Sequence, residues 1–194
     1  TIDRSESGKT HLKIPNYSIR TIYWDYILQL TKDRNKDVMT DLILQQDAIS
    51  TLAYKGAPKP YLDYISENIL GRLSNRDLRN FNEKYIKIIL LNGLFQSKIY
   101  LTITELEVSR GYVDIYMQRS HLLPDIRYEW VWEIKYIPKK DAEDDKKHLL
   151  QEKREEARAQ LNKYRASAMF SGRTDVRYLS LIFIGKDRYE MEEV

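Results

Sequence analysis

Three ionisable residues, Asp114, Glu133 and Lys135, lie in segments that are otherwise apolar and aromatic. Asp114 stands in the middle of Gly-Tyr-Val-Asp-Ile-Tyr-Met, where a carboxylate is unfavourable unless it has a partner. Glu133 and Lys135 lie in Trp-Glu-Ile-Lys-Tyr, and residues two apart in a strand point to the same face of a sheet. If the two strands are neighbours, these three side chains converge at one end of a small sheet.

Two carboxylates beside a lysine predict a site for a hard divalent cation, Mg²⁺ or Mn²⁺. Mg²⁺ prefers oxygen ligands, commonly takes one or two carboxylates and keeps waters that can become nucleophiles. Asp114 and Glu133 can supply these oxygens, and the peptide carbonyl of Ile134 is a further candidate ligand. Lys135 can position or help deprotonate the attacking water and can neutralise charge that develops on a phosphate.

The strands that would carry these residues follow from the hydrophobic pattern. Residues 99–108 and 111–117 are rich in branched and aromatic side chains and are separated by Ser109-Arg110-Gly111, which predicts a hairpin. Residues 127–137 predict a third strand, because apolar residues alternate with positions that include Glu133 and Lys135. One face of this strand is therefore apolar and the other carries charged side chains. A nearly continuous apolar run over 178–184 predicts a strand that helices cover on both sides.

Helical spacing predicts the elements around these strands. A helix is expected from the capping signal of Ser74 and Asp77 to about Leu94, and another over 146–170 with Gly172 at its end. The predicted order from residue 75 is therefore helix, strand, strand, strand, helix, strand.

The first seventy-odd residues are expected to be helical after a polar connector. Three helices are predicted, over residues 18–30, 37–54 and 61–73. We therefore divide the chain into a connector (1–16), a helical segment (17–73) and a principal domain (74–194).

The order of these residues and elements resembles the PD-(D/E)xK nuclease superfamily. Asp114 followed by Glu133-Ile134-Lys135 is similar to the superfamily motif, and Glu83 lies on the preceding helix, where members often place another metal-site carboxylate. Gln160 and Tyr164 are four apart on the following helix and resemble the Gln-x-x-x-Tyr signature of the RecB-like branch. The resemblance implies an α/β restriction-endonuclease-like fold, a small mixed sheet flanked by helices, with the N-terminal helical segment packed on one side.

What the resemblance implies about function is divalent-metal-dependent hydrolysis of phosphodiester bonds in nucleic acid, with DNA favoured over RNA as the substrate. Glu83, Asp114, Glu133 and the Ile134 carbonyl would hold Mg²⁺ or Mn²⁺, and Lys135 would act on the attacking water or the scissile phosphate. The remaining pair, Gln160 and Tyr164, would orient the substrate or brace the site.

A bacterial family that joins an AAA-type ATPase-like domain to such a nuclease-like domain is similar over nearly the whole chain. Leu-x-Ile-Pro-Asn at residues 12–16 resembles the stretch after the ATPase portion, and the start at Thr1 agrees with a C-terminal fragment of a longer chain. One departure is Tyr112, where many relatives have arginine, so that this arginine's contribution is missing here.

Composition sets further limits. A formal net charge of +3 over 194 residues is too small to diagnose nucleic-acid binding, so any cationic surface must be local. Cysteine is absent, which excludes disulfides, thiolate metal sites and cysteine nucleophiles. Without an apolar run of membrane-span length or a signal peptide pattern, we predict a cytoplasmic protein that does not engage membranes.

Other motifs carry no function. Ser-Gly-Lys-Thr at residues 7–10 lacks the earlier glycine and the preceding strand of a phosphate loop. The three histidines have no metal-ligand spacing. The basic residues between 146 and 158 alternate with acids, which favours a solvated helix face over a nucleic-acid groove.

Alternatives stay open for single residues and for the domain as a whole. Glu133 and Lys135 alone are also typical of a cross-strand ion pair, and Glu83 of the solvent-facing side of a helix. Gln160 could be a polar surface position and Tyr164 a core aromatic. The domain as a whole could be a noncatalytic scaffold for an ATPase partner, or a passenger of a helical adaptor formed by residues 17–73.

Overall fold

The computed structural model describes residues 2–4, 10–12, 36–73, 82–108, 111–139, 146–186 and 188–194. The chain divides into two compact units, Thr1–Leu42 and Ile43–Val194. In the first unit, β1 (Ile2–Arg4) and β2 (Thr10–Leu12) pair antiparallel. The helix expected over 18–30 lies outside the described residues.

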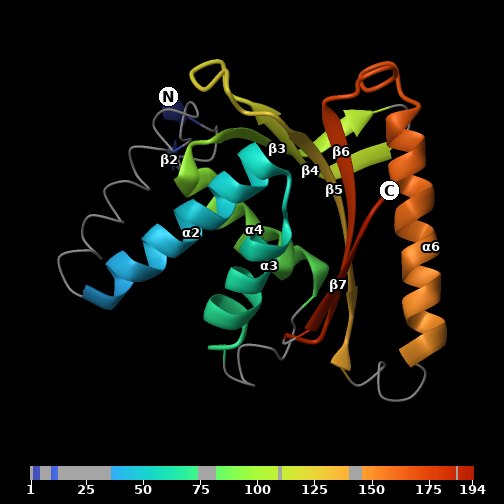
Figure 1. The fold of residues 1–194 in the computed structure, drawn as a ribbon, viewed down its shortest axis with the longest axis horizontal. Helices are drawn as coiled ribbons and strands as arrows, with labels where there is room; N and C mark the ends of the chain where they lie inside the picture. The colour runs from blue at the N-terminus through green and yellow to red at the C-terminus, as the bar shows by residue number, and fades with distance from the viewer. Residues whose placement is uncertain are drawn as a thin grey trace. The chain divides into compact units, whose positions relative to one another are not determined.

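A mixed sheet of five strands forms the centre of the second unit (Figure 1). The strand order follows the chain, and β5 and β6 pair in parallel while the other neighbours are antiparallel. The parallel pair is connected by helix α6 (Lys146–Arg165), as a parallel connection requires. The strands are β3 (Tyr100–Val108), β4 (Gly111–Arg119), β5 (Glu129–Ile137), β6 (Val176–Ile184) and β7 (Arg188–Glu193).

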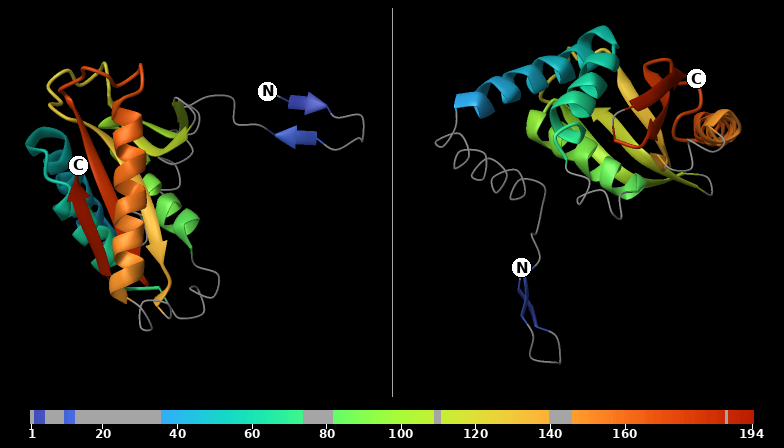
Figure 2. Two further views of the ribbon diagram at one scale, coloured as in Figure 1. Left: turned by 90° about the vertical axis from the view of Figure 1, so that its right-hand side faces the viewer. Right: turned by 90° about the horizontal axis from the view of Figure 1, so that it is seen from below.

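Helices cover both faces of this sheet (Figures 1 and 2). One face carries the C-terminal part of α2 (Lys36–Lys55), α3 (Lys59–Tyr64), the π-helix η1 (Ile65–Leu70) and α4 (Glu83–Ser97), whose apolar residues share one core cluster with the sheet. The other face carries α6, which packs in two smaller clusters. The α/β architecture of a small mixed sheet flanked by helices, as in the restriction-endonuclease fold, is therefore confirmed.

The predicted elements are largely confirmed, with several differences. Strands β1 and β2 lie in the expected connector, the helix expected over 61–73 is α3 followed by η1 and ends at Leu70, and the helix expected over 146–170 ends at Arg165. The hairpin, the strand over 127–137 and the strand over 178–184 correspond to β3 to β6, and the helix over 37–54 corresponds to α2. The capping signal at Ser74 and Asp77 lies outside the described residues, and the described helix begins later, after Asn82. The final strand, β7, was not predicted.

Helix α4 positions the first site residue. Asn82 is its N-cap, in extended conformation, and its side-chain oxygen accepts a hydrogen bond from the Lys84 backbone at 3.0 Å. Gly93 lets the helix approach its neighbours, because a Cβ there would come closer than 3.0 Å to the Tyr61 hydroxyl and the Gln45 side chain. This close packing fixes α4, whose first residue is Glu83, against α2 and α3.

Candidate active site

In both β3 and β4, the regular alternation of side chains between the two faces of the sheet is interrupted halfway along the strand. Ile103 and Leu106 are three apart in β3, yet both pack in the cluster that α6 covers. Their partners in β4, Tyr116 and Val113, belong to the same cluster. Because strand residues normally alternate between faces, the backbone must depart from regular strand geometry between these two pairs.

The departure lies at Glu105 and Asp114. The β3–β4 ladder pairs Thr104 with Ile115 and Leu106 with Val113, but it contains no pair between Glu105 and Asp114. Glu105 has a φ of 51°, a left-handed conformation that is uncommon for a residue other than glycine. The sequence-predicted Asp114 thus lies where the ladder is open, and its carboxylate can reach groups on both sides.

The Asp114 carboxylate connects β4 to β5 and to α4. Its Oδ2 accepts a hydrogen bond from the backbone N–H of Ile134 at 2.9 Å, and its Oδ1 accepts one from Lys87 Nζ at 2.8 Å. The β4–β5 ladder ends with Ile115 and Trp132, so the side chain of Asp114 satisfies an N–H that the strand partner leaves unpaired. Asp114 itself is buried.

Glu133 and Lys135 lie on the face of β5 that α6 covers, as alternation predicted. Lys135 Nζ donates to Oε1 of Glu133 at 2.8 Å. The other carboxylate oxygen, Oε2, lies 3.1 Å from the hydroxyl of Tyr164, which is also 2.7 Å from the carbonyl oxygen of Tyr112. Glu133 is only 2% exposed, so this ion pair is not a solvated surface contact.

The negative charge of Asp114 raises the pKa values of two neighbouring glutamates, Glu83 and Glu133. Burial, followed by the negative charge of Asp114, raises the pKa of Glu133 from 4.5 to about 7, against the hydrogen bond from Lys135. The pKa of Glu83 is raised by burial and by Asp114, although Lys135, Lys87 and Lys153 oppose the shift. Asp114 therefore lies within electrostatic reach of both Glu83 and Glu133.

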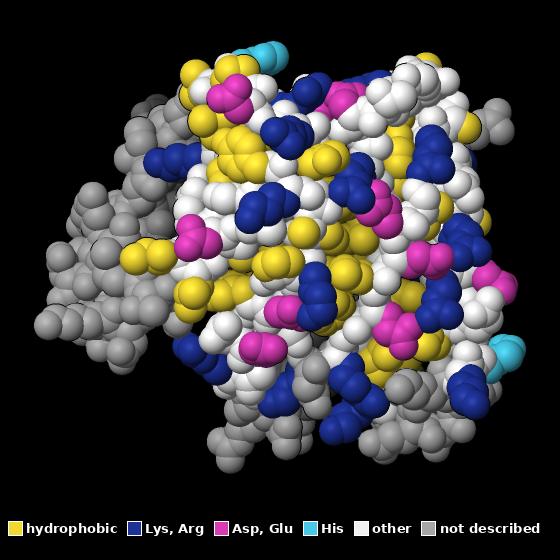
Figure 3. All heavy atoms as spheres, in the orientation of Figure 1, with side chains coloured by type: hydrophobic (Ala, Val, Ile, Leu, Met, Phe, Trp, Pro, Cys, Tyr) yellow, Lys and Arg dark blue, Asp and Glu magenta, His cyan; other side chains and the backbone are white. Residues whose placement is uncertain are grey.

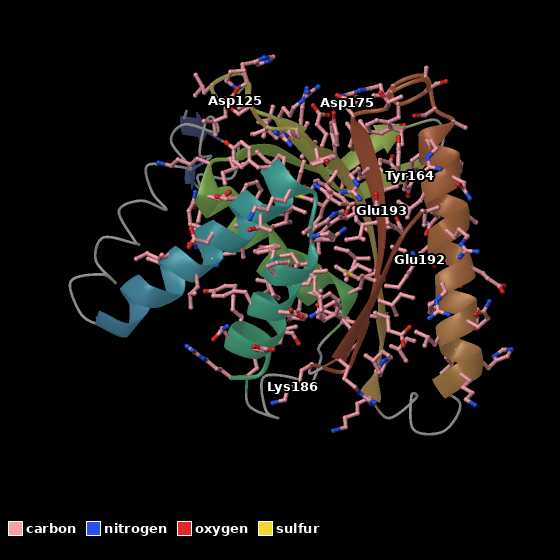
Figure 4. All side chains as sticks on the ribbon, viewed as in Figure 1. Asp125, Tyr164, Asp175, Lys186, Glu192 and Glu193 are labelled. Atoms are coloured by element: carbon pink, nitrogen blue, oxygen red, sulfur yellow. The ribbon has the colours of Figure 1, made fainter. Side chains whose placement is uncertain are left out.

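Helix α6 carries Gln160 and Tyr164, the two residues that resemble the Gln-x-x-x-Tyr signature. Tyr164 is buried between α6 and the sheet (Figure 4), and the pKa of its hydroxyl is raised by burial and by the charge of Glu133. Gln160 lies one turn earlier, and its Oε1 atom is buried without a hydrogen-bond partner in the described part of the chain. Tyr164 therefore both packs in the core and contacts Glu133.

The donor set suits a divalent cation. Glu83 and Glu133 have pKa values raised by burial and by the nearby charge of Asp114, and a cation among these carboxylates would stabilise their charged forms. The buried Oε1 of Gln160 has no hydrogen-bond partner among the described residues. Among the described residues, however, no three histidine, aspartate or glutamate side chains form a ready-made metal cluster. Lysines pair with the two buried carboxylates instead.

Sequence reasoning missed two residues of this site, Lys87 and Glu105. Lys87 pairs with both Asp114 and Glu105, and its side chain is 14% exposed. The sequence did carry a signal for Lys87, because it lies four residues after Glu83 and therefore on the same helix face. Glu105 has no comparable signal, since its position depends on an irregular backbone.

The basic run along α6 is paired with acidic residues. Arg154 contacts Glu190 and Arg158 contacts Glu192, both on β7, while Lys153 bonds with Glu156. Figure 3 shows basic and acidic side chains interspersed along this helix. These pairs agree with a solvated, charge-balanced face.

Comparison with known proteins yields one match. A family model described as the PD-(D/E)XK nuclease superfamily matches residues 81–193, which is more than half of the chain and includes α4, the five-stranded sheet and α6. Neither a curated protein nor a solved structure matches the chain significantly. In the described ranges, no helix combines the length and the apolar character that a membrane span needs.

Proposed function

Because the chain belongs to the PD-(D/E)XK nuclease superfamily, we propose that it is a divalent-metal-dependent nuclease that hydrolyses phosphodiester bonds of nucleic acid. The observation that carries this proposal is the connection between the two halves of the motif. The backbone N–H of Ile134, between Glu133 and Lys135, donates to the carboxylate of Asp114 at 2.9 Å, so the buried Asp114 is joined to the strand segment that carries Glu133 and Lys135.

Each residue has a role that follows from its contacts. Glu83, Asp114 and Glu133, with the carbonyl of Ile134, would hold Mg²⁺ or Mn²⁺. The bound ion would supply Lewis acidity and lower the pKa of its water. Lys135, which Glu133 holds at 2.8 Å, would orient the attacking water and neutralise charge on the scissile phosphate.

The residues of α6 would support these groups. The Tyr164 hydroxyl lies 3.1 Å from Glu133 and would keep that carboxylate oriented, while the unpartnered Oε1 of Gln160 would accept a hydrogen bond from the substrate or its waters. This pair supports assignment to the RecB-like branch.

We infer that the substrate is DNA rather than RNA and that the protein works in the cytoplasm. The likeness of residues 12–16 to the stretch that follows an AAA-type ATPase portion supports an upstream ATPase-like domain in the natural chain. With it, residues 1–16 would be a connector, 17–73 a helical segment and 74–194 the nuclease domain.

The test is cleavage of labelled DNA and RNA with Mg²⁺, Mn²⁺ or excess chelator. Asp114→Asn and Lys135→Met remove a ligand charge and the ammonium with little change of shape, and each should lower the cleavage rate by roughly 100-fold or more. Lys55→Met, at an exposed position on α2, serves as the control. Circular dichroism checks that every variant is folded.

Intact substrates in every condition, with a folded wild-type protein, would contradict a nuclease. That result would favour a noncatalytic scaffold that keeps the fold. Binding of nucleic acid or of the ATPase without cleavage would identify such a scaffold.

A further inference from the structure

Lys87 occupies one of the two oxygens of the central carboxylate. Asp114 Oδ2 already accepts the N–H of Ile134, which leaves Oδ1 as the oxygen without a backbone bond and the more open one to a cation, and Lys87 Nζ lies 2.8 Å from it. Burial of Lys87 opposes its charge, but its bonds to Asp114 and Glu105 raise its pKa, so that it is an ammonium. Lys87 and a metal ion would therefore compete for the same atom.

Glu105 offers Lys87 a second, more exposed partner. The carboxylate of Glu105 pairs with Lys87 Nζ, yet its side chain is 58% exposed, in contrast to 11% for Asp114. Its left-handed backbone coincides with the open point of the β3–β4 ladder. Such backbone conformations are unfavourable and tend to be retained at functional sites.

The surroundings give the ammonium room to move. Lys87 and Glu105 both line a pocket of about 280 Å³ between α4 and β3, together with Glu83, Ile88 and Thr104. A lysine side chain that leaves Asp114 can therefore enter this pocket while it keeps its bond to Glu105. A buried ammonium without any partner would be strongly unfavourable, which makes the second carboxylate necessary.

We propose that Lys87 is a positioning residue that bonds to both Asp114 and Glu105 while no metal is bound and keeps only its bond to Glu105 when a divalent cation takes the Oδ1 oxygen. This inference rests on the proposed metal-dependent function and adds a device that sets cation affinity. Lys87 restrains the free carboxylate, and Glu105 makes its displacement possible.

Isothermal titration with Mn²⁺ tests the exchange without relying on cleavage. Lys87→Met removes the competing ammonium, so the protein should bind Mn²⁺ roughly tenfold more tightly. Lys153→Met is the matched control, because Lys153 lies within electrostatic reach of Glu83 but bonds with Glu156. In this control only a nearby positive charge is lost, so the Mn²⁺ affinity of Lys153→Met should differ from that of the wild type by less than about threefold.

Glu105→Gln supplies the second arm. In the wild-type background it should weaken Mn²⁺ binding several-fold, because the displaced Lys87 loses its partner. In the Lys87→Met background it should have no effect, since Glu105 acts through Lys87. A field effect of the Glu105 charge would instead weaken binding equally in both backgrounds, which the double-mutant cycle separates.

Unchanged or weaker Mn²⁺ binding by folded Lys87→Met, or an equal effect of Glu105→Gln in both backgrounds, would overturn the exchange. If the wild-type protein still cleaves nucleic acid, the proposed function stands. No Mn²⁺ binding by any variant, together with intact substrates, would overturn both. Lys87→Gln takes the place of Lys87→Met if the latter does not fold.

Discussion

Replacing Glu133 by glutamine removes a carboxylate that the fold holds at a raised pKa. The wild-type side chain is 2% exposed, and burial with the charge of Asp114 moves its pKa from 4.5 to about 7. Between pH 4.5 and about pH 7, Glu133 is protonated in the folded state and deprotonated in the unfolded state. The free energy of unfolding contributed by this group is therefore highest at low pH and falls as the pH rises through this window.

The magnitude follows from the size of the shift. Moving a pKa from 4.5 to about 7 corresponds to roughly 3 kcal/mol of lost stability once the pH is above the folded value. Glu133→Gln also removes the partner of Lys135, so the stability of the variant at a single pH is not informative. The difference between the wild type and the variant as a function of pH isolates the carboxylate.

Urea unfolding at pH 5, 6, 7 and 8, followed by circular dichroism, measures this difference. Relative to Glu133→Gln, the wild type should lose up to roughly 3 kcal/mol between pH 5 and 8, most of it below pH 7. Glu107→Gln, at an exposed position on β3, should follow the wild-type curve. Parallel curves for the wild type and Glu133→Gln would refute the reasoning, because they would mean that Glu133 keeps an ordinary pKa in the folded protein.

Two further substitutions test the packing around the site. Gly93→Ala should destabilise the protein by about 1–3 kcal/mol in urea unfolding, because its Cβ would press on the Tyr61 hydroxyl and Gln45, and an unchanged or raised stability would contradict this packing. Tyr164→Phe removes the hydroxyl that contacts Glu133 and should lower stability by roughly 1 kcal/mol. If Tyr164 only packs, cleavage by Tyr164→Phe stays at the wild-type rate, whereas a bracing role predicts a slower reaction measured at equal protein stability.

The sequence predicted the elements whose pattern is regular. Alternation along β5 placed Glu133 and Lys135 on one face, opposite Trp130 and Trp132, because the strand is regular and each face meets a different environment. The edge strand β7 was missed because Arg-Tyr-Glu-Met-Glu-Glu is mostly charged and has few of the residues that favour strands.

What alternation could not predict is the direction of Asp114. A regular β4 would keep Val113 and Ile115 on one face, but the two residues pack in different clusters. The left-handed backbone of Glu105, on the neighbouring strand, accompanies this change. Nothing in the residue type of Glu105 indicates that conformation, since glycine or asparagine would be its usual occupant.

Lysine partners explain how the fold tolerates the two buried carboxylates of this site. Asp114 is matched by Lys87 from α4, and Glu133 is matched by Lys135 from its own strand. Each carboxylate would be strongly unfavourable without such a partner, so the lysines stabilise the site before any cation arrives. A bound metal must replace part of this compensation. The two lysines therefore differ. Lys135 can remain beside Glu133 and act on the substrate, whereas Lys87 must give up an Asp114 oxygen and keep its bond to the exposed Glu105.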